Sequence, residues 1–226
     1  QNCNLEKIYL TASGGPFRRL PINQFKNITI TKALKHPNWS MGKKISIDSA
    51  TMMNKVFEII EAKKIFNLNY GQLEILTHPQ SYLHALIKFN NGLIKFLAHD
   101  TSMTVPIFNS LFSDGKKKLK SKPLNIEVLN NLSLTEVDIK RFPVVNIINY
   151  LQNKDSLFET VIVSANDALV HKFLLGKIKF TDISRILLKI LNLKQFIKYK
   201  KMQPTKIDDI YKLSKVVSFK IDTLSV

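Results

Sequence analysis

The sequence is poor in cysteine, in acidic residues and in long apolar runs, and each shortage narrows what the chain can be. Cys3 is the only cysteine among 226 residues, which excludes a disulfide framework and a cysteine-based zinc site within the chain. No apolar run approaches the about 20 residues that a membrane-spanning helix needs. The segment 1–7 lacks the basic and then apolar order of a signal peptide. We therefore expect a soluble protein of a reducing compartment, the cytoplasm or, in a eukaryote, a plastid, without a membrane partner.

Basic residues outnumber acidic ones, with 34 Lys and Arg against 17 Asp and Glu and a formal net charge of +17. Clustered lysines release counterions from nucleic acids, and the segments 116–122 and 198–201 are dense in lysine. The other lysines are scattered among Asn, Ile and Leu, and no RNA- or DNA-binding signature accompanies them. The composition favours a general drift toward Lys, Asn and Ile, and nucleic-acid binding stays the alternative.

The first half of the chain has the texture of a mixed α/β domain. A strand is expected over 5–12, running into the tight loop Ser13-Gly14-Gly15-Pro16. Further strands are expected over 44–48 and 72–77, and a hairpin over 83–97 turns at Asn90-Asn91-Gly92. Between them, Asp48-Ser49 offers an N-cap to a helix from Ala50 to about Phe66.

The texture changes near residue 115, where a Gly and a run of lysines have linker composition. Beyond Arg141, apolar residues recur at helical spacing, and Thr181 is suited to cap one of the helices. Helices are expected over 144–151, 155–175, 181–196 and 205–218. We therefore predict an α/β (α+β) catalytic domain with a small mixed sheet flanked by helices over 1–114, a linker over 115–140, and an all-α helical bundle over 141–226.

The Ser13-Gly14-Gly15 loop leaves a strand without large side chains that would block approach to its backbone. Its exposed N–H groups could form a nest for an anion, with the Ser13 hydroxyl as an added donor. Ser-Gly-Gly is also common in ordinary turns, and taken alone the motif favours that simpler reading.

The segment His36-Pro37-Asn38-Trp39-Ser40-Met41-Gly42 places the only tryptophan of the chain in a polar loop. A loop Trp that closes over a ligand is one reading, and a Trp that anchors the loop to the core is the other. The segment by itself does not decide between them.

Asn54, Lys55 and Glu58 lie within one turn of the expected helix, so their side chains can converge. Ser49 at the expected helix N-terminus would add a hydroxyl and the positive end of the helix dipole, which suits phosphate. Lys55 is a point charge for phosphate, and Glu58 is a hard oxygen donor for Mg²⁺ or Mn²⁺. From spacing alone, a solvated helix face with a Lys–Glu pair is the favoured alternative.

His78 and His84 flank Pro79-Gln80-Ser81, where a strand gives way to the hairpin. They are six residues apart and separated by a proline, so they lack the helical spacing of a preformed metal pair. We expect structural or substrate-shaping histidines.

Several of these segments together resemble the 1-deoxy-D-xylulose 5-phosphate reductoisomerases, in the order and spacing of that family. The matching runs are residues 13–18 (SGGPFR), 36–46 (HPNWSMGKKIS), 48–55 (DSATMMNK) and 78–81 (HPQS), with weaker echoes at 122–124, 164–167 and 180–183. The resemblance is strong to about residue 90 and looser afterwards, and it extends over nearly the whole chain.

The resemblance implies an enzyme that converts 1-deoxy-D-xylulose 5-phosphate to 2-C-methyl-D-erythritol 4-phosphate in non-mevalonate isoprenoid precursor biosynthesis, with NADPH and a divalent metal (Mn²⁺, Mg²⁺ or Co²⁺). It implies a homodimer and a phosphorylated sugar as substrate. By the same resemblance, His36, Trp39 and Glu58 would be catalytic, and Met41 and Gly42 would lie against the cofactor. Glu58 would ligate the metal, and the substrate would be held by Ser13, His36, Ser49, Asn54, Lys55 and Glu58.

The sequence also departs from the family's pattern. The family has an NADPH-binding domain and an Asp-Ser-Glu segment with two metal ligands ahead of the Ser-Gly-Gly loop, and neither is present here. We therefore expect a fragment or a truncated gene product that is inactive alone, and the alternative is a non-enzymatic basic remnant or a nucleic-acid-binding protein. Val56, Thr101 and Asp167 replace a Gly, a Pro and a Glu of the family, and their effect on activity stays open.

Overall fold

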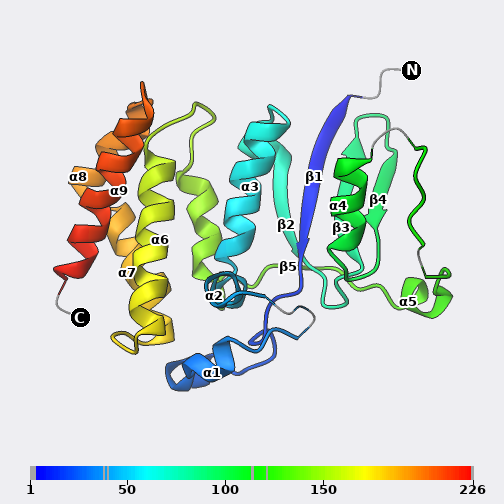
Figure 1. Cartoon of the computed structure of the whole chain (residues 1–226), viewed down its shortest axis with the longest axis horizontal. Coiled ribbons are helices and arrows are strands. Elements are labelled where there is room, and N and C mark those ends of the chain that lie inside the picture. Colours follow the sequence, from blue (N-terminus) through cyan, green and yellow to red (C-terminus); the bar gives the residue numbers. More distant parts are fainter. Residues whose placement is uncertain (1–3, 38, 40, 113–114, 121, 225–226) are drawn as a thin grey trace. The chain divides into compact units, whose positions relative to one another are not determined.

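The computed structural model describes residues 4–37, 39, 41–112, 115–120 and 122–224, so Cys3 lies outside the described residues. The chain forms two compact units (Figure 1). The sheet unit comprises Gln1–Gly14 and Gly71–Val137, and the helical unit comprises Gly15–Tyr70 and Asp138–Val226. Each unit is therefore built from two separate stretches of the chain.

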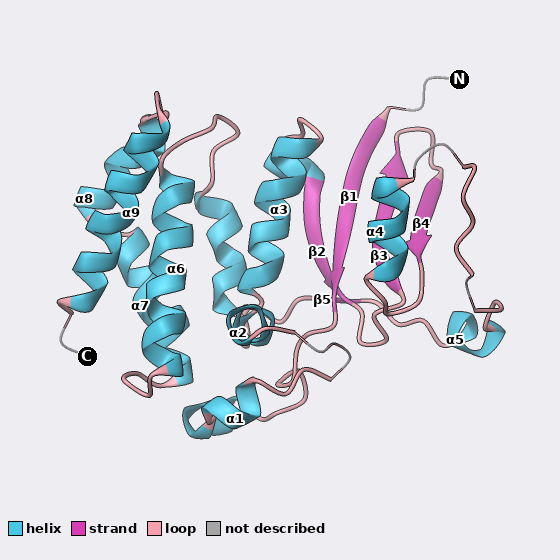
Figure 2. Ribbon diagram, viewed as in Figure 1, coloured by secondary structure: helices cyan, strands magenta, loops and turns pink. Residues whose placement is uncertain are grey.

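The sheet unit holds a five-stranded sheet with the order β4-β3-β1-β2-β5 (Figure 2). β1 and β2 are parallel, and the other neighbouring pairs are antiparallel. The strands are β1 (Leu5–Ala12), β2 (Leu73–Thr77), β3 (Leu83–Phe89), β4 (Ile94–Ala98) and β5 (Thr135–Glu136), and the unit also has the helices α4 (Thr104–Leu111) and α5 (Ile126–Asn130). The mixed sheet confirms the predicted fold class.

The hairpin of β3 and β4 forms where the Asn-Gly turn predicts it. Gly92 has a positive φ of 85°, a backbone conformation that glycine adopts without a steric penalty. The strands β1 and β2 also match the expected ranges closely. By contrast, α4, α5 and β5 were not predicted; all three are short, and α5 and β5 fall in the expected linker.

The helical unit is a bundle whose long members are α6 (Phe158–Leu174), α7 (Phe180–Leu191) and α9 (Ile207–Asp222). α6 packs against both α7 and α9 and is the most buried of the three (Figure 1). Its buried residues recur at helical spacing, from Phe158 through Ile162 and Leu169 to Phe173. The remaining elements are η1 (Ile22–Asn27), α1 (Ile30–Ala33), α2 (Lys43–Thr51), α3 (Met53–Ile65), η3 (Pro143–Tyr150), α8 (Lys194–Ile197) and η4 (Lys198–Lys201), with η2 (Tyr70–Gln72) at the boundary of the units.

The expected strand over 44–48 is wrong, because these residues belong to helix α2. Ser46, Ile47, Ala50 and Thr51 are buried, which is a helical spacing and not the alternation of a strand. Seen from the viewpoint of Figure 1, α2 is end-on while α3 runs along the page, so the chain turns sharply between them.

The turn between α2 and α3 lies at Met52, which has a left-handed conformation with φ 68°. The expected helix start at Asp48-Ser49 is therefore also wrong. Ser49 lies in the last turn of α2, and α3 begins at Met53. The Thr51 hydroxyl accepts a hydrogen bond from the Met53 N–H at 3.3 Å and so helps to start α3.

Helix α7 does not use Thr181 as its cap. Its N-cap is Lys179, whose backbone N–H donates to the Asp182 carboxylate at 2.9 Å. The helix begins within one residue of the predicted position, but the predicted capping residue is wrong.

The compact units differ from the expected division into 1–114, 115–140 and 141–226. Parallel pairing of β1 with β2 requires a long connection, and here residues 13–72 leave the sheet and return to it. Most of that connection joins the helical unit, while β5 brings part of the expected linker into the sheet. The functional division into catalytic, linker and C-terminal parts stays a prediction.

Gly15 tests how tightly the Ser-Gly-Gly loop is built. A Cβ at Gly15 would lie 2.9 Å from the Ser49 carbonyl oxygen, and its φ is +63°. We predict that Gly15→Ala lowers the free energy of unfolding by about 1 kcal/mol for the backbone and by about 1–3 kcal/mol more for overpacking. Gly92→Ala is the control, because its φ is +85° but nothing lies within 4 Å. Equal losses in urea unfolding would contradict the close approach of Gly15 to α2.

Candidate functional site

Asn54, Lys55 and Glu58 converge on the first turns of α3, as their spacing predicts. The Asn54 side-chain amide donates to Glu58 Oε1 at 2.8 Å, and the Lys55 ammonium donates to Glu58 Oε2 at 2.6 Å. Both oxygens of the Glu58 carboxylate therefore have partners within the helix. A phosphate on Lys55 or a metal on Glu58 would have to replace or share these contacts.

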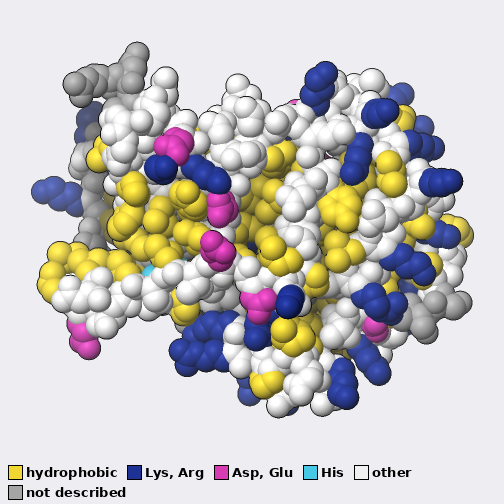
Figure 3. All heavy atoms as spheres, turned by 180° about the vertical axis from the view of Figure 1, so that it is seen from behind, with side chains coloured by type: hydrophobic (Ala, Val, Ile, Leu, Met, Phe, Trp, Pro, Cys, Tyr) yellow, Lys and Arg dark blue, Asp and Glu magenta, His cyan; other side chains and the backbone are white. Residues whose placement is uncertain are grey.

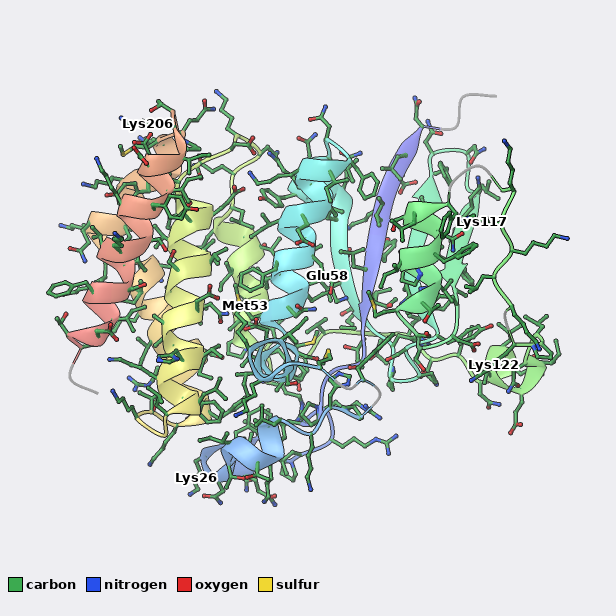
Figure 4. The ribbon with its side chains drawn as sticks, viewed as in Figure 1. Lys26, Met53, Glu58, Lys117, Lys122 and Lys206 are labelled. Atoms are coloured by element: carbon green, nitrogen blue, oxygen red, sulfur yellow. The ribbon has the colours of Figure 1, made fainter. Side chains whose placement is uncertain are left out.

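The cluster opens into a cavity of about 420 Å³ in the helical unit. Asn54 and Glu58 line it from α3, and Figure 4 labels Glu58 on that helix. The other lining residues are the polar Lys44, Asp48 and Glu61 and the apolar Ile45, Phe57, Ile60 and Val163. The lining combines one ammonium with three carboxylates on a largely apolar wall, so the cavity can offer hard oxygen ligands to a cation, and Lys55 is not among its lining residues.

Ser49 lies in the last turn of α2, beside the corner that the chain forms at Met52 between α2 and α3, and not at a helix N-terminus. Because α3 begins at Met53, the positive end of its dipole lies near Asn54 and Lys55 instead. Gly15 packs against the Ser49 and Ala50 backbone, so the end of the Ser-Gly-Gly loop contacts α2. Ser13, also half-buried, belongs to the sheet unit at the end of β1.

His36 lies half-buried in the loop before α2, and its Nδ1 accepts a hydrogen bond from the Trp39 N–H at 3.0 Å. Burial, and then the positive charge of Arg18, lower the pKa of His36 below its ordinary value. The imidazole is therefore neutral at pH 7, with Nδ1 as the acceptor and the proton on Nε2 as a donor.

The rest of this loop is only partly described, because Asn38 and Ser40 lie outside the described residues. Trp39 and Met41 are half-buried, which distinguishes neither a lid nor an anchor. Gly42 is exposed and forms the N-cap of α2, and no described residue lies within 4 Å of the place that a Cβ would take there. Their catalytic and cofactor roles stay predictions.

The segment from His78 to Ser81 connects β1 to the chain before β5 by hydrogen bonds within the sheet unit. His78 is fully buried, its N–H donates to the Ala12 carbonyl at 2.7 Å, and its Nδ1 lies 2.7 Å from the Ser133 carbonyl. The Gln80 amide donates to the Asn131 carbonyl at 2.7 Å. Together they hold the segment before β5 against the sheet, which is a structural role of the kind expected for His78.

His84 does not pair with His78 but stacks on His99, with ring centroids 3.6 Å apart. Among the residues that the structure describes, no group of three His, Cys, Asp or Glu side chains could hold a metal. Glu58 is a carboxylate that can supply one hard oxygen ligand, so the described residues fit a partial metal site.

The three departures from the family pattern lie in different environments. Val56 is fully buried and is not a lining residue of the cavity, so its extra methyl groups are accommodated in the core. Asp167 reaches Lys44 with an ion pair of 2.9 Å, and Thr101 is exposed.

Sequence reasoning missed Lys44, Asp48 and Asn166, which form a polar network beside the cavity. Lys44 and Asp48 form an i,i+4 ion pair of 2.7 Å, which is a helical spacing. Reading 44–48 as a strand concealed that signal, because residues four apart on a strand are far from contact.

Two family models match the chain. The model described as the 1-deoxy-D-xylulose 5-phosphate reductoisomerase C-terminal domain matches residues 1–66, and the model described as the DXP reductoisomerase C-terminal domain matches residues 99–218. A 1-deoxy-D-xylulose 5-phosphate reductoisomerase of Pelagibacter ubique (strain HTCC1062) is 66% identical over 223 residues, which are 99% of this chain and 58% of that protein. One of Persephonella marina is 41% identical over 86% of this chain and 52% of its own length.

Solved structures agree with these matches. A crystal structure of DOX-P reductoisomerase in complex with NADPH, fosmidomycin and magnesium superposes with a TM-score of 0.88 at 32% identity, covering 97% of this chain and 55% of that one. The Zymomonas mobilis enzyme in complex with NADPH superposes with a TM-score of 0.82 at 30% identity, covering 98% and 57%. The chain thus spans little more than half the length of the relatives that it matches.

The fold is that of an α+β protein with a five-stranded mixed sheet and a helical bundle, and its candidate ligand site is the cavity lined by Asn54 and Glu58. More particularly, the chain belongs to the DXP reductoisomerase C-terminal domain family. The resemblance seen in the sequence is confirmed. Within the described part of the chain, no helix combines the length and apolar character needed to cross a membrane.

The environment of His36 can be tested by NMR titration. We predict a His36 pKa below 6.5, so the unfolded chain takes up this proton first and the folded state loses stability as pH falls below about 6.5. Arg18→Gln should raise the pKa of His36 toward 6.5 without reaching it, because burial is the larger cause. Arg19→Gln removes the same charge one residue away and should leave the pKa unchanged. Equal effects of the two variants would contradict the assignment to Arg18.

Proposed function

We propose that this chain supplies the substrate-binding part and one metal ligand of a 1-deoxy-D-xylulose 5-phosphate reductoisomerase. The reaction is the rearrangement and NADPH-dependent reduction of 1-deoxy-D-xylulose 5-phosphate to 2-C-methyl-D-erythritol 4-phosphate, in non-mevalonate isoprenoid precursor biosynthesis in the cytoplasm. The observation that carries the proposal is the Asn54–Lys55–Glu58 cluster at a cavity, in a chain of this family.

Substrate binding in this proposal begins with the phosphate. Lys55 supplies a positive charge and Asn54 an amide donor at the N-terminal turn of α3, where the helix dipole also favours an anion. Ser49 and Ser13 supply hydroxyl donors. A phosphate that engages Lys55 releases it from the ion pair of 2.6 Å with Glu58, and the Glu58 carboxylate is then free to bind a cation.

His36 and Trp39 act at the reacting end of the substrate in this proposal. The neutral imidazole of His36 accepts from the Trp39 N–H at Nδ1, so its proton lies on Nε2, which donates a hydrogen bond to a substrate oxygen. The lowered pKa of His36 keeps the ring neutral at pH 7. Trp39 and Met41 cover the substrate and exclude water. Gly42 lies against the cofactor, and no described residue comes within 4 Å of the place that a Cβ would take there.

The cofactors are NADPH and a divalent metal, either Mn²⁺, Mg²⁺ or Co²⁺. Solved structures of DOX-P reductoisomerase contain NADPH and magnesium. When bound, the metal would polarise the substrate's carbonyl and NADPH would supply a hydride. Of the described residues, Glu58 is the one that we assign to the metal, and the ligands that complete the site belong to a segment outside this chain.

A non-enzymatic basic protein is the alternative. Figure 3 shows Lys and Arg side chains spread over the helical unit without forming a single stripe, a distribution that supports compositional drift more than a nucleic-acid groove.

The proposed activity can be tested by joining the chain to the N-terminal region of the Pelagibacter ubique relative. We predict NADPH oxidation with 1-deoxy-D-xylulose 5-phosphate and Mn²⁺, and none by the isolated chain. Glu58→Gln should lower kcat/KM by about 100-fold or more, because a metal ligand loses its charge. Glu61→Gln is the control, since Glu61 lines the same cavity one turn further along α3. A folded chimera without turnover, or equal losses for both variants, would refute the proposal.

We also propose a homodimer that buries the edge strand β4. All five residues of β4 are exposed, and its outer edge has no neighbour in the described sheet. Figure 3 shows hydrophobic side chains gathered over the sheet unit, on the face opposite to that of Figure 1. The exposed apolar residues of this strand and its turn include Leu93, Ile94, Phe96 and Leu97, at 46–57% exposure. An apolar edge of this kind supports an interface between copies.

The dimer proposal predicts that Phe96→Asp yields a monomer in light scattering, because a carboxylate would be buried without a partner. Ile65→Asp is the control, since Ile65 is 72% exposed at the end of α3 and outside the sheet unit. A dimer that persists in Phe96→Asp would exclude β4 from the interface.

A further inference from the structure

Asp48 is a buried carboxylate that none of the proposed roles explains. Asp48 is 1% exposed. One carboxylate oxygen accepts from the Asn166 side-chain amide at 2.8 Å, and the other pairs with the Lys44 ammonium at 2.7 Å. Lys44 also pairs with Asp167 at 2.9 Å. Two polar contacts therefore join α2 to α6.

The burial of Asp48 is costly for stability. Burial raises the pKa of the Asp48 carboxyl, and the hydrogen bonds from Lys44 and Asn166 oppose that rise only in part. Asn166 is fully buried, and its side-chain oxygen has no hydrogen-bond partner among the described residues. Buried charged pairs are often no more stabilising than apolar replacements, so a network of this kind is weak evidence for a purely stabilising role.

The position of Asp48 links this network to the site. Asp48 directly precedes Ser49, and α2 ends three residues later at Thr51, before the Met52 corner and the start of α3. Lys44 and Asp48 line the same cavity as Asn54 and Glu58. A rotation of α2 on α6 would therefore move Ser49 and the first turn of α3 together.

We propose that Asp48 is a positioning residue, whose contacts with Asn166 and Lys44 hold the α2–α3 corner against α6 so that Ser49, Asn54 and Lys55 face the substrate phosphate. The inference rests on the proposed function. In this role Asp48 affects the affinity for the substrate phosphate, separately from any effect on folding.

The same unit contains a matched network for comparison. Glu159 is 8% exposed and accepts from the Tyr70 hydroxyl at 2.8 Å, while Lys64 pairs with it at 2.8 Å. It too ties α6 to the α3 region through a neutral donor and a lysine. None of these three residues lines the cavity or adjoins Ser49.

The experiment compares Asn166→Asp, the swapped pair Asp48→Asn/Asn166→Asp, and Tyr70→Phe in the chimeric enzyme. Asn166→Asp puts two carboxylates about 3 Å apart, which repel when both are ionised and hold together when they share a proton. We expect KM for the substrate to rise about tenfold at pH 8.5 relative to the unmodified enzyme, with kcat changed less than about threefold. That ratio should fall toward one as pH is lowered to 6.

The swapped pair keeps one carboxylate and one hydrogen bond but moves the carboxylate away from residue 48, which pairs with Lys44, so its KM should rise less than that of Asn166→Asp and should not change between pH 6 and pH 8.5. Tyr70→Phe should lower the melting temperature without changing KM, because it loosens α6 away from the site. A normal KM for Asn166→Asp at pH 8.5, or an equal rise for Tyr70→Phe, would overturn the proposal.

The role of Asp48 can still be tested if the proposed function is wrong. A folded, unmodified chimera without turnover refutes that function alone, and inorganic phosphate affinity measured by ³¹P NMR then decides the role of Asp48. Weaker phosphate binding by Asn166→Asp than by Tyr70→Phe at pH 8.5 supports the positioning role. Equal affinity, or no phosphate binding by the unmodified protein, overturns it.

Discussion

The left-handed turn at Met52 is the constraint on which the candidate site depends. A non-glycine residue with φ 68° costs about 1–2 kcal/mol in backbone energy. Burial of Met52 and Met53, at 2% and 0% exposure, offsets that cost, since burying such a side chain contributes about 1.5–3 kcal/mol. Because the chain turns here, Ser49 closes one helix while Asn54 and Lys55 open the next. A single continuous helix would instead place Ser49 and Lys55 more than one turn apart along one axis.

Polar contacts between residues far apart in the sequence hold α2 and the loop after Gly15 in place. Asp48 reaches Asn166 on α6, and Arg141 donates to the carbonyl oxygens of Phe17 and Leu20 in the loop that follows Gly15. An aromatic cluster of Phe17, Phe25, Phe173 and Phe180 packs the same loop against α6 and α7. The C-terminal bundle therefore supports the segments that carry the candidate ligands.

Much of the sheet could be predicted because its signals are local. β1 and the β3–β4 hairpin follow from β-branched runs and from an Asn-Gly turn. The helix over 43–51 could not be read in the same way, since a stretch of mixed polarity such as Lys44 to Asp48 satisfies both periods over five residues. That error also concealed the Lys44–Asp48 pair. The short α5 and β5 form because the chain beside them holds them, as Gln80 and His78 hold residues 131 and 133.

The sequence by itself determined the family, the types of side chain at the site and the i,i+3 and i,i+4 geometry of Asn54, Lys55 and Glu58, because these depend on identity and on spacing within one helix. The tertiary structure decided which helix end meets those residues, that residues 13–72 leave the sheet to join the helical unit, and that Asp48 is buried against Asn166. Those features depend on contacts between segments as much as 118 residues apart, and no local periodicity encodes them.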